Sequence, residues 1–160
     1  MIVVSDTSPI LNLARIGRLE LLASLYRQVL IPPAVHAELM ASNLTPAMDL
    51  ACNSWLTIAV PKDEQRVQDL RDELDPGEAE AIVLALERKA DLLLVDERRG
   101  RRIAAALGLP ITGLLGVLAD AKRSGLIENV KPLLDELIGH ARFWIGADLY
   151  ARVLAEMDER

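Results

Sequence analysis

The stretch DLLLVDERRG, residues 91–100, decides the fold class of this chain. Its apolar run from Leu92 to Val95 is continuous rather than alternating, which is typical of a parallel strand buried on both faces. Asp96 ends the run, and the residues after it have helical spacing. The stretch therefore predicts one strand–helix unit of an α/β domain, with a carboxylate at the carboxyl end of the strand.

Four further apolar runs of this kind alternate with helical segments along the chain. Strands are expected over residues 2–5, 28–32, 56–60, 91–95 and 109–112. Helices are expected over residues 9–16, 18–26, 33–41, 46–53, 62–73, 78–89, 97–107, 112–124, 128–140 and 148–158. Strands separated by helices pair in parallel through right-handed crossovers. We expect one three-layer α/β/α domain with a central parallel sheet, spanning residues 1–160.

The composition bears on the class of the protein and on its cellular compartment. The net charge of −6 argues mildly against a general nucleic-acid binder, which is usually basic. Aromatic residues make up only 3% of the chain, so little surface for stacking nucleobases is expected. The single cysteine, Cys52, cannot form an internal disulfide. Without a signal peptide or the roughly 18 apolar residues of a membrane span, we expect a soluble cytoplasmic protein.

A second acid, Asp6, ends a second buried run at residues 2–5. Ligands of parallel sheets bind outside the carboxyl ends of the strands, where the strand order reverses. If the two strands are neighbours, about 4.8 Å apart, Asp6 and Asp96 face a shared crevice. A lone aspartate at a strand end is more often a turn former or helix cap. Two of them after two of the most apolar runs favour a site.

Two of the expected helices supply further acidic candidates. Glu38 lies on the short helix after the second strand, where a lone glutamate is usually a surface residue. Glu78 and Glu80 point about 200° apart around their helix, so only one of them can face a site. Glu78 shares the core-facing side, yet Asp75 and Glu78 also have the spacing of a capping box, which would leave the chemistry to Glu80. We favour Glu78 and keep Glu80 as the alternative.

A cluster of such carboxylates requires a cation. At about 5 Å and an effective dielectric near 20, each like-charged pair costs on the order of 3 kcal/mol. Oxygen ligands without thiolate or imidazole select Mg²⁺ or Mn²⁺ rather than zinc, and such an ion suits the hydrolysis of phosphodiester bonds. The basic residues that follow Asp96 form either a solvated helix face or a patch that steers phosphate groups. They are Arg98, Arg99, Arg101 and Arg102.

Four motifs, in this order and at these spacings, resemble the PIN-domain family. They are VSDTSPI (4–10), IPPAVHAEL (31–39), LDPGEAEAIVLALE (74–87) and LLLVDERRGRRIA (92–104). More narrowly, they resemble a prokaryotic branch of PIN-like proteins related to the VapC-type toxins. The resemblance implies a metal-dependent ribonuclease whose parallel sheet has the strand order 3-2-1-4-5.

The resemblance also assigns roles residue by residue. Four positions match the acids of the family, and they would be both catalytic residues and ligands of Mg²⁺ or Mn²⁺. They are Asp6, Glu38, Glu78 and Asp96. The third acid is usually an aspartate, so a glutamate there moves the carboxylate by one methylene. Thr7 and Ser8 resemble the hydroxyl residues that orient the first acid.

The leading hypothesis is therefore a Mg²⁺- or Mn²⁺-dependent endoribonuclease, with the toxin half of a toxin–antitoxin pair as one form of it. RNA, an antitoxin protein and a second copy in a homodimer are the partners it implies. The alternative is a catalytically weak PIN-like module that binds RNA or protein. An aspartyl-phosphate phosphatase is a weaker rival, because Ser8 stands where that class places a second acid. The apolar side of the helix at 148–158 packs on the sheet or docks a partner.

Overall fold

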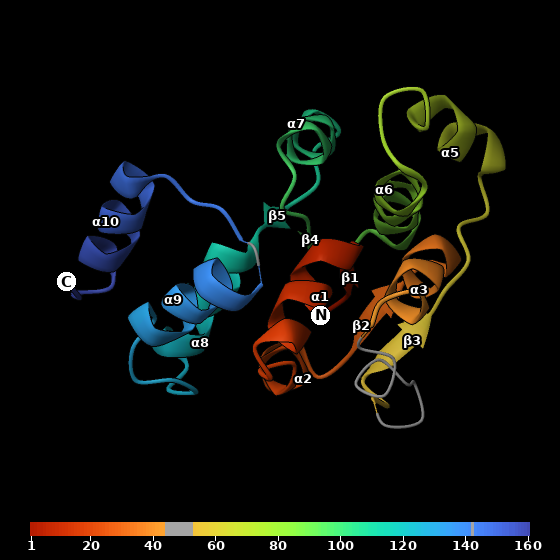
Figure 1. The fold of residues 1–160 in the computed structure, drawn as a ribbon. Helices are drawn as coiled ribbons and strands as arrows, with labels where there is room; N and C mark the ends of the chain where they lie inside the picture. The colour runs from red at the N-terminus through yellow and green to blue at the C-terminus, as the bar shows by residue number, and fades with distance from the viewer. Residues whose placement is uncertain (44–52, 142) are drawn as a thin grey trace.

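A five-stranded parallel sheet forms the centre of the computed structural model, which describes residues 1–43, 53–141 and 143–160 (Figure 1). The strand order is β3-β2-β1-β4-β5. The strands are β1 (Val3–Ser5), β2 (Val29–Ile31), β3 (Leu56–Ile58), β4 (Leu92–Leu94) and β5 (Ile111–Thr112). All five expected strands are present, and the order implied by the family resemblance is confirmed.

The helices of the described residues follow the expected spacing closely. They are α1 (Thr7–Arg15), α2 (Glu20–Tyr26), α3 (Pro33–Met40), α5 (Glu64–Leu70), α6 (Pro76–Arg88), α7 (Arg98–Ala106), α8 (Leu114–Arg123), α9 (Lys131–His140) and α10 (Ala147–Glu156). The helix expected over 46–53 falls almost entirely outside the described residues. Helix α1 begins two residues before Pro9, because the first N–H groups of a helix lack acceptors and proline is tolerated there. None of the helices described here is long and apolar enough to cross a membrane.

The two faces of the sheet are covered by different helices, because successive strand residues point to opposite faces. Val3 and Leu94 belong to the core on the side of α1, α2, α8 and α9. Val4 and Leu93 belong to the core on the side of α5, α6 and α7. Two cores on either side of one sheet confirm the three-layer α/β/α architecture.

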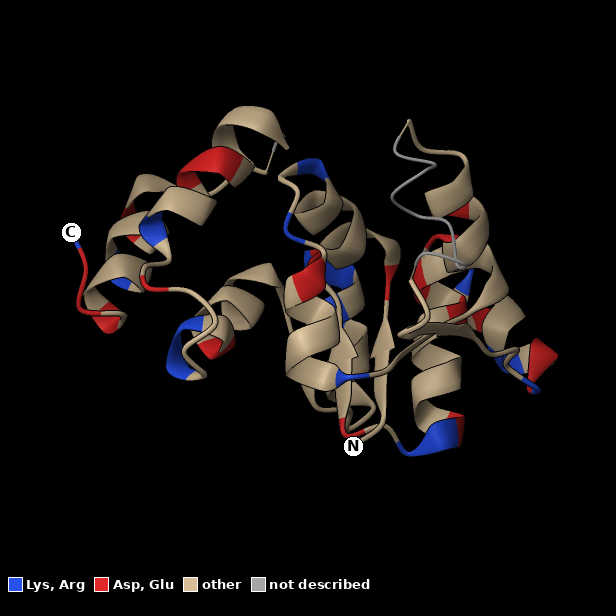
Figure 2. Ribbon diagram, turned by 90° about the horizontal axis from the view of Figure 1, so that it is seen from below, with Lys and Arg blue, Asp and Glu red and all other residues tan. Residues whose placement is uncertain are grey.

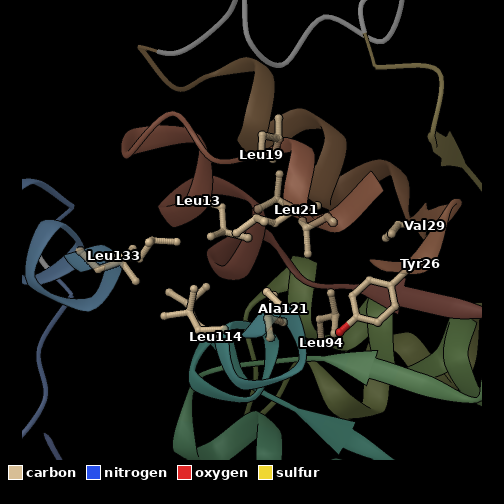
Figure 3. Close-up of a cluster of buried hydrophobic side chains, with 14 of the residues drawn as sticks. Leu13, Leu19, Leu21, Tyr26, Val29, Leu94, Leu114, Ala121 and Leu133 are labelled. Atoms are coloured by element: carbon tan, nitrogen blue, oxygen red, sulfur yellow. The ribbon is translucent and has the colours of Figure 1, made fainter. Parts of the chain in front are cut away.

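The larger core packs leucines from helices that are far apart in sequence. Leu13 of α1, Leu114 of α8 and Leu133 of α9 point into the same space (Figure 3). Each of these side chains is almost fully buried, and burying one leucine contributes roughly 1.5–3 kcal/mol. These contacts fix α8 against α1, and so fix where the first residues of α8 stand beside β4.

Helix α10 lies beyond α8 and α9, at the outer edge of the molecule (Figure 1). Tyr150 and Val153 of α10, and Met157 directly after it, pack on the core that contains α8 and α9. The helix therefore covers other helices, whereas one interpretation of the sequence placed it on the sheet. The side chain of Glu159, 7% exposed, ties the end of the chain to this pair. It accepts hydrogen bonds from Lys122 Nζ at 2.8 Å and from the backbone N–H groups of Val130 at 2.8 Å and Lys131 at 3.0 Å.

We expect Glu159→Gln to lower the free energy of unfolding at neutral pH by about 1–2 kcal/mol, because charged hydrogen bonds are lost. Burial raises the pKa of Glu159, but the bonds from Lys122, Val130 and Lys131 outweigh it and hold this pKa below its ordinary value. A lowered folded pKa contributes stability above the unfolded pKa, and this is lost as the pH falls through the folded pKa. Denaturant unfolding should show wild type and variant converging below about pH 4. A constant difference across pH would contradict this account.

Candidate active site

Asp6 stands where the strand order of the sheet reverses. Strand β1 pairs with β2 on one side and with β4 on the other, and the connections from β1 and β4 leave in opposite directions. The backbone N–H of Asp6 donates to Leu94 O at 2.9 Å, so the strand pairing continues up to this residue. Asp6 is the N-cap of α1, and only 4% of it is exposed. The sheet thus delivers a buried carboxylate to its own carboxyl edge.

Glu38 of α3 joins Asp6 beside the first turn of α6. A Cβ atom on Gly77 would lie 2.8 Å from Glu38 Oε1 and 3.3 Å from Asp6 Oδ1. Both carboxylates therefore approach the same point on the backbone of α6. The Thr7 hydroxyl donates to Glu38 Oε2. The family resemblance implies that this hydroxyl orients the first acid, but it bonds the second, and only the Thr7 backbone N–H bonds Asp6. We refer to Asp6 and Glu38 as the acid pair.

The acid pair is electrostatically strained without a cation. Burial raises the pKa of Asp6 from its ordinary 3.8 to about 7, against the lowering effect of the Thr7 backbone N–H. The charges of Asp75, Glu38 and Glu97 raise it further. Burial likewise raises the pKa of Glu38, although the Thr7 hydroxyl opposes this shift. At neutral pH Asp6 is therefore partly protonated in the metal-free protein, and a bound cation would displace this proton.

Glu78 makes the capping box that the sequence offered as an alternative to a role in the site. Its backbone N–H donates to Asp75 Oδ1 at 2.8 Å, and its own Oε1 accepts from the Asp75 N–H at 3.4 Å. Its second oxygen, Oε2, is buried without a hydrogen-bond partner among the described residues, and it lies 2.6 Å from the position of a Cβ on Gly100. Burial, followed by the contacts with Asp75 and the charge of Asp6, raises the pKa of Glu78 to about 8. Capping thus uses one of its oxygens and leaves the other unsatisfied.

Glu80, the alternative to Glu78, lies on another side of α6. It is half-buried, and its Oε1 accepts from the backbone N–H of Ala34 at the start of α3 at 3.3 Å. Its charge contributes to the raised pKa of Glu38. Glu80 therefore ties α6 to α3, next to the acid pair.

Asp96 follows β4, the neighbour of β1, as expected, but its side chain turns toward α8. Its Oδ1 accepts from the backbone N–H of Leu114 at 2.7 Å. A Cβ on Gly113 would lie 2.7 Å from Asp96 Oδ1 and 2.8 Å from Arg101 Nη1, so the guanidinium of Arg101 stands beside this carboxylate. Burial raises the pKa of Asp96, while the Leu114 N–H and Arg101 lower it. Its Oδ2 is buried and has no hydrogen-bond partner among the residues described.

The four candidate acids are thus brought to one edge of the sheet but not into a single cluster. Within the described parts of the chain, no three Asp, Glu, His or Cys side chains form a ready-made metal-binding group. The donor atoms nevertheless suit a divalent cation. They are hard carboxylate oxygens with raised pKa values, and Glu78 and Asp96 each hold one buried oxygen without a partner. Such a set fits Mg²⁺ or Mn²⁺ better than a softer metal.

Three features of the site were missed in the sequence. Asp75 was interpreted only as a helix cap, yet its charge raises the pKa values of Asp6, Glu38 and Glu78. Gly77 and Gly100 lie in the first turns of α6 and α7, where each leaves room for a carboxylate oxygen. A glycine inside a helix costs about 1 kcal/mol relative to alanine. That cost was the available signal that something packs closely against these positions.

Comparison with known protein families matches residues 2–159 to DUF3368, a family of PIN domains. The match extends over nearly the whole chain and confirms the resemblance inferred from the four motifs. No curated protein matches the sequence.

Proposed function

Because the chain belongs to the PIN-domain family, whose members are nuclease-type modules, we propose that it is a Mg²⁺- or Mn²⁺-dependent endoribonuclease. The observation that carries the proposal is the acid pair, buried Asp6 and half-buried Glu38, which converges on Gly77 with a raised pKa at both carboxyls. Two carboxylates that approach the same point of the backbone, one of them buried, need a compensating cation. Residues 1–160 act as one domain in this proposal.

Asp6 and Glu38 would hold the metal, and Glu78 and Asp96 are the further ligands that the family resemblance implies. When bound, the ion supplies the Lewis acidity that the hydrolysis of a phosphodiester requires. Thr7 and the Gly77 backbone N–H hold the carboxylate of Glu38, and the Leu114 N–H holds that of Asp96. These bonds fix the acids before the substrate arrives, which is the preorganisation that catalysis requires.

The remaining parts of the proposal follow from the family. They are an RNA substrate, a role as a cytoplasmic toxin with an antitoxin partner, and a homodimer. Co-expression with the product of a neighbouring reading frame would test the antitoxin, and sedimentation of the purified protein would test the dimer. If the protein is a monomer and no such product inhibits it, the antitoxin and the homodimer are refuted. The proposed ribonuclease activity is not affected by that result.

Cleavage of mixed RNA tests the central activity. We expect wild type to cut RNA with Mn²⁺ and to be inactive with EDTA, and we expect Asp96→Asn to lose at least about 100-fold in rate. RNA binding without cleavage, and with no dependence on metal, would favour the alternative of a catalytically weak binding module. The absence of a ready-made three-residue metal group among the described residues is the observation that keeps this alternative in the test.

The affinity for Mn²⁺ should rise with pH between about pH 6 and about pH 8. The pKa of Asp6 is raised to about 7 and that of Glu78 to about 8, so at lower pH the ion must displace protons. We expect the dissociation constant to fall up to about tenfold per pH unit for each proton displaced. Calorimetric titration in buffers of different ionisation enthalpy measures both the affinity and the number of protons released. An affinity independent of pH would show that these carboxyls do not bind the ion.

A further inference from the structure

A groove of about 570 Å³ opens beside Asp96 and leads away from the acid pair. It runs past β5 and the first turn of α8 to Phe143 and Trp144, which precede α10. Its size is within the roughly 300–1,000 Å³ of typical ligand sites. The lining residues that matter here are Asp96, Arg98, Arg101, Thr112, Gly113 and Trp144.

One side of the groove is cationic. Arg98 is exposed, and no hydrogen bond or ion pair holds its guanidinium among the described residues. Arg101 is half-buried and is fixed by a bond from Nη1 to Val95 O at 2.9 Å. Figure 2 shows acidic and basic positions interspersed over the helices of this acidic chain. The two arginines give the mouth of this groove a positive charge beside a candidate catalytic acid, although the chain as a whole is acidic. Such a pair suits the binding of phosphate groups.

The other side of the groove is aromatic. Trp144 is 85% exposed, although a tryptophan in a folded domain usually buries most of its surface. Phe143 precedes it and also lines the groove. The low aromatic content of the sequence predicted little stacking surface, yet two of the few aromatic residues stand here together. An indole held open beside arginines offers a face on which a nucleobase can stack.

We propose that this groove binds one nucleotide of a single-stranded RNA, next to the phosphodiester that is cleaved at the acids. The base stacks on Trp144, and the phosphate on its cleavage-site side binds Arg98 and Arg101. This assignment rests on the proposed function and adds the position of the RNA strand and the residues that bind it. Charge complementarity and continuity with Asp96 favour RNA over a protein partner for this groove.

Binding of a labelled, mixed-sequence single-stranded RNA in EDTA tests the groove without cleavage. We expect Trp144→Ala to weaken binding roughly 5- to 100-fold, the usual effect of losing one stacked base, and Trp144→Phe to restore part of it. Arg98→Ala should reduce the dependence of log affinity on log salt by about 0.7. Arg88→Ala is the matched control, because it removes the same charge from an exposed position of α6 outside the groove and should bind like wild type.

In a Trp55→Phe background, Trp144 is the only tryptophan, and its fluorescence should be quenched as RNA binds. Wild-type affinity and salt dependence in both Trp144→Ala and Arg98→Ala would overturn the groove, while metal-dependent cleavage by these variants would leave the ribonuclease proposal intact. A dimer that dissociates with Trp144→Ala, without loss of RNA affinity, would show that the face binds a second copy and would also overturn the groove. A wild-type protein that neither cleaves nor binds RNA would instead refute the proposed function.

Discussion

Asp6→Asn is expected to abolish metal-dependent RNA cleavage and, at the same time, to stabilise the metal-free protein. The substitution removes a metal ligand, so the rate should fall at least about 100-fold. The pKa of Asp6 is about 7 in the folded protein and about 3.9 in an unfolded chain. A raised carboxyl pKa means that the folded state binds more protons in this interval, so stability falls as the pH rises through it. Asparagine removes that loss, worth about 2–4 kcal/mol at about pH 8.

Thermal unfolding in EDTA across pH measures this effect. Wild type should lose stability between about pH 4 and about pH 8 and regain it with Mn²⁺, whereas Asp6→Asn should be flatter and indifferent to Mn²⁺. Asp72→Asn is the matched control, since Asp72 is exposed, and it should behave like wild type. An Asp6→Asn protein that is less stable than wild type at every pH would show that Asp6 has a structural role and is not a strained ligand.

Gly77→Ala should inactivate the protein while leaving it folded. The new Cβ would lie 2.8 and 3.2 Å from the two carboxylate oxygens of Glu38 and 3.3 Å from Asp6 Oδ1. Contacts this short force the acid pair apart, and a displacement of about 1 Å at a reacting centre can cost roughly 100-fold in rate. We expect Mn²⁺ affinity and the rate of cleavage to fall together, because both depend on the distance between the carboxylates of Asp6 and Glu38.

Gly139→Ala is the matched control for this substitution. Gly139 is a helical residue of α9 with nothing within 4 Å of its Cβ position, so alanine should stabilise the helix by up to about 1 kcal/mol without changing the rate. Full activity of Gly77→Ala would show that the acids do not act at the position described above.

The fold could be predicted from the sequence because its strands are apolar runs, and such runs are typical of parallel strands covered by helices on both faces. The run ending at Asp96 and the run ending at Asp6 are both buried on two faces, which is typical of parallel strands with helices on both sides of the sheet. The two strands are neighbours, as expected, because Ser5 of β1 pairs with Leu94 of β4. Helix ends were less exact, as at α1, because the N-cap Asp6 shifts the start of the helix.

The arrangement of the acids could not be predicted in the same way. Asp96 follows β4 as expected, but its side chain accepts a hydrogen bond from the backbone N–H of Leu114. That contact depends on where the packing of α8 against α1 places the start of α8, which no local pattern encodes. The capping box of Glu78 was visible in the sequence, yet only the structure shows that its second oxygen lies against Gly100.

The groove at Trp144 was missed for a related reason. Composition counts aromatic residues but does not locate them, and Trp144 lies 48 positions after Asp96 in the sequence. The chain returns to β5, at the edge of the sheet, only after α8 and α9, so the position of Trp144 depends on how these helices pack in the larger core. The sequence therefore predicts which residues carry chemistry better than it predicts which of them meet.

A crystal structure grown with Mn²⁺, with data collected at the manganese absorption edge, tests the central claim most directly. The account predicts an anomalous peak bound by the carboxylates of Asp6 and Glu38 beside Gly77, and its loss in Asp6→Asn. A protein that cleaves RNA with Mn²⁺ but shows its only peak away from these two side chains would contradict it.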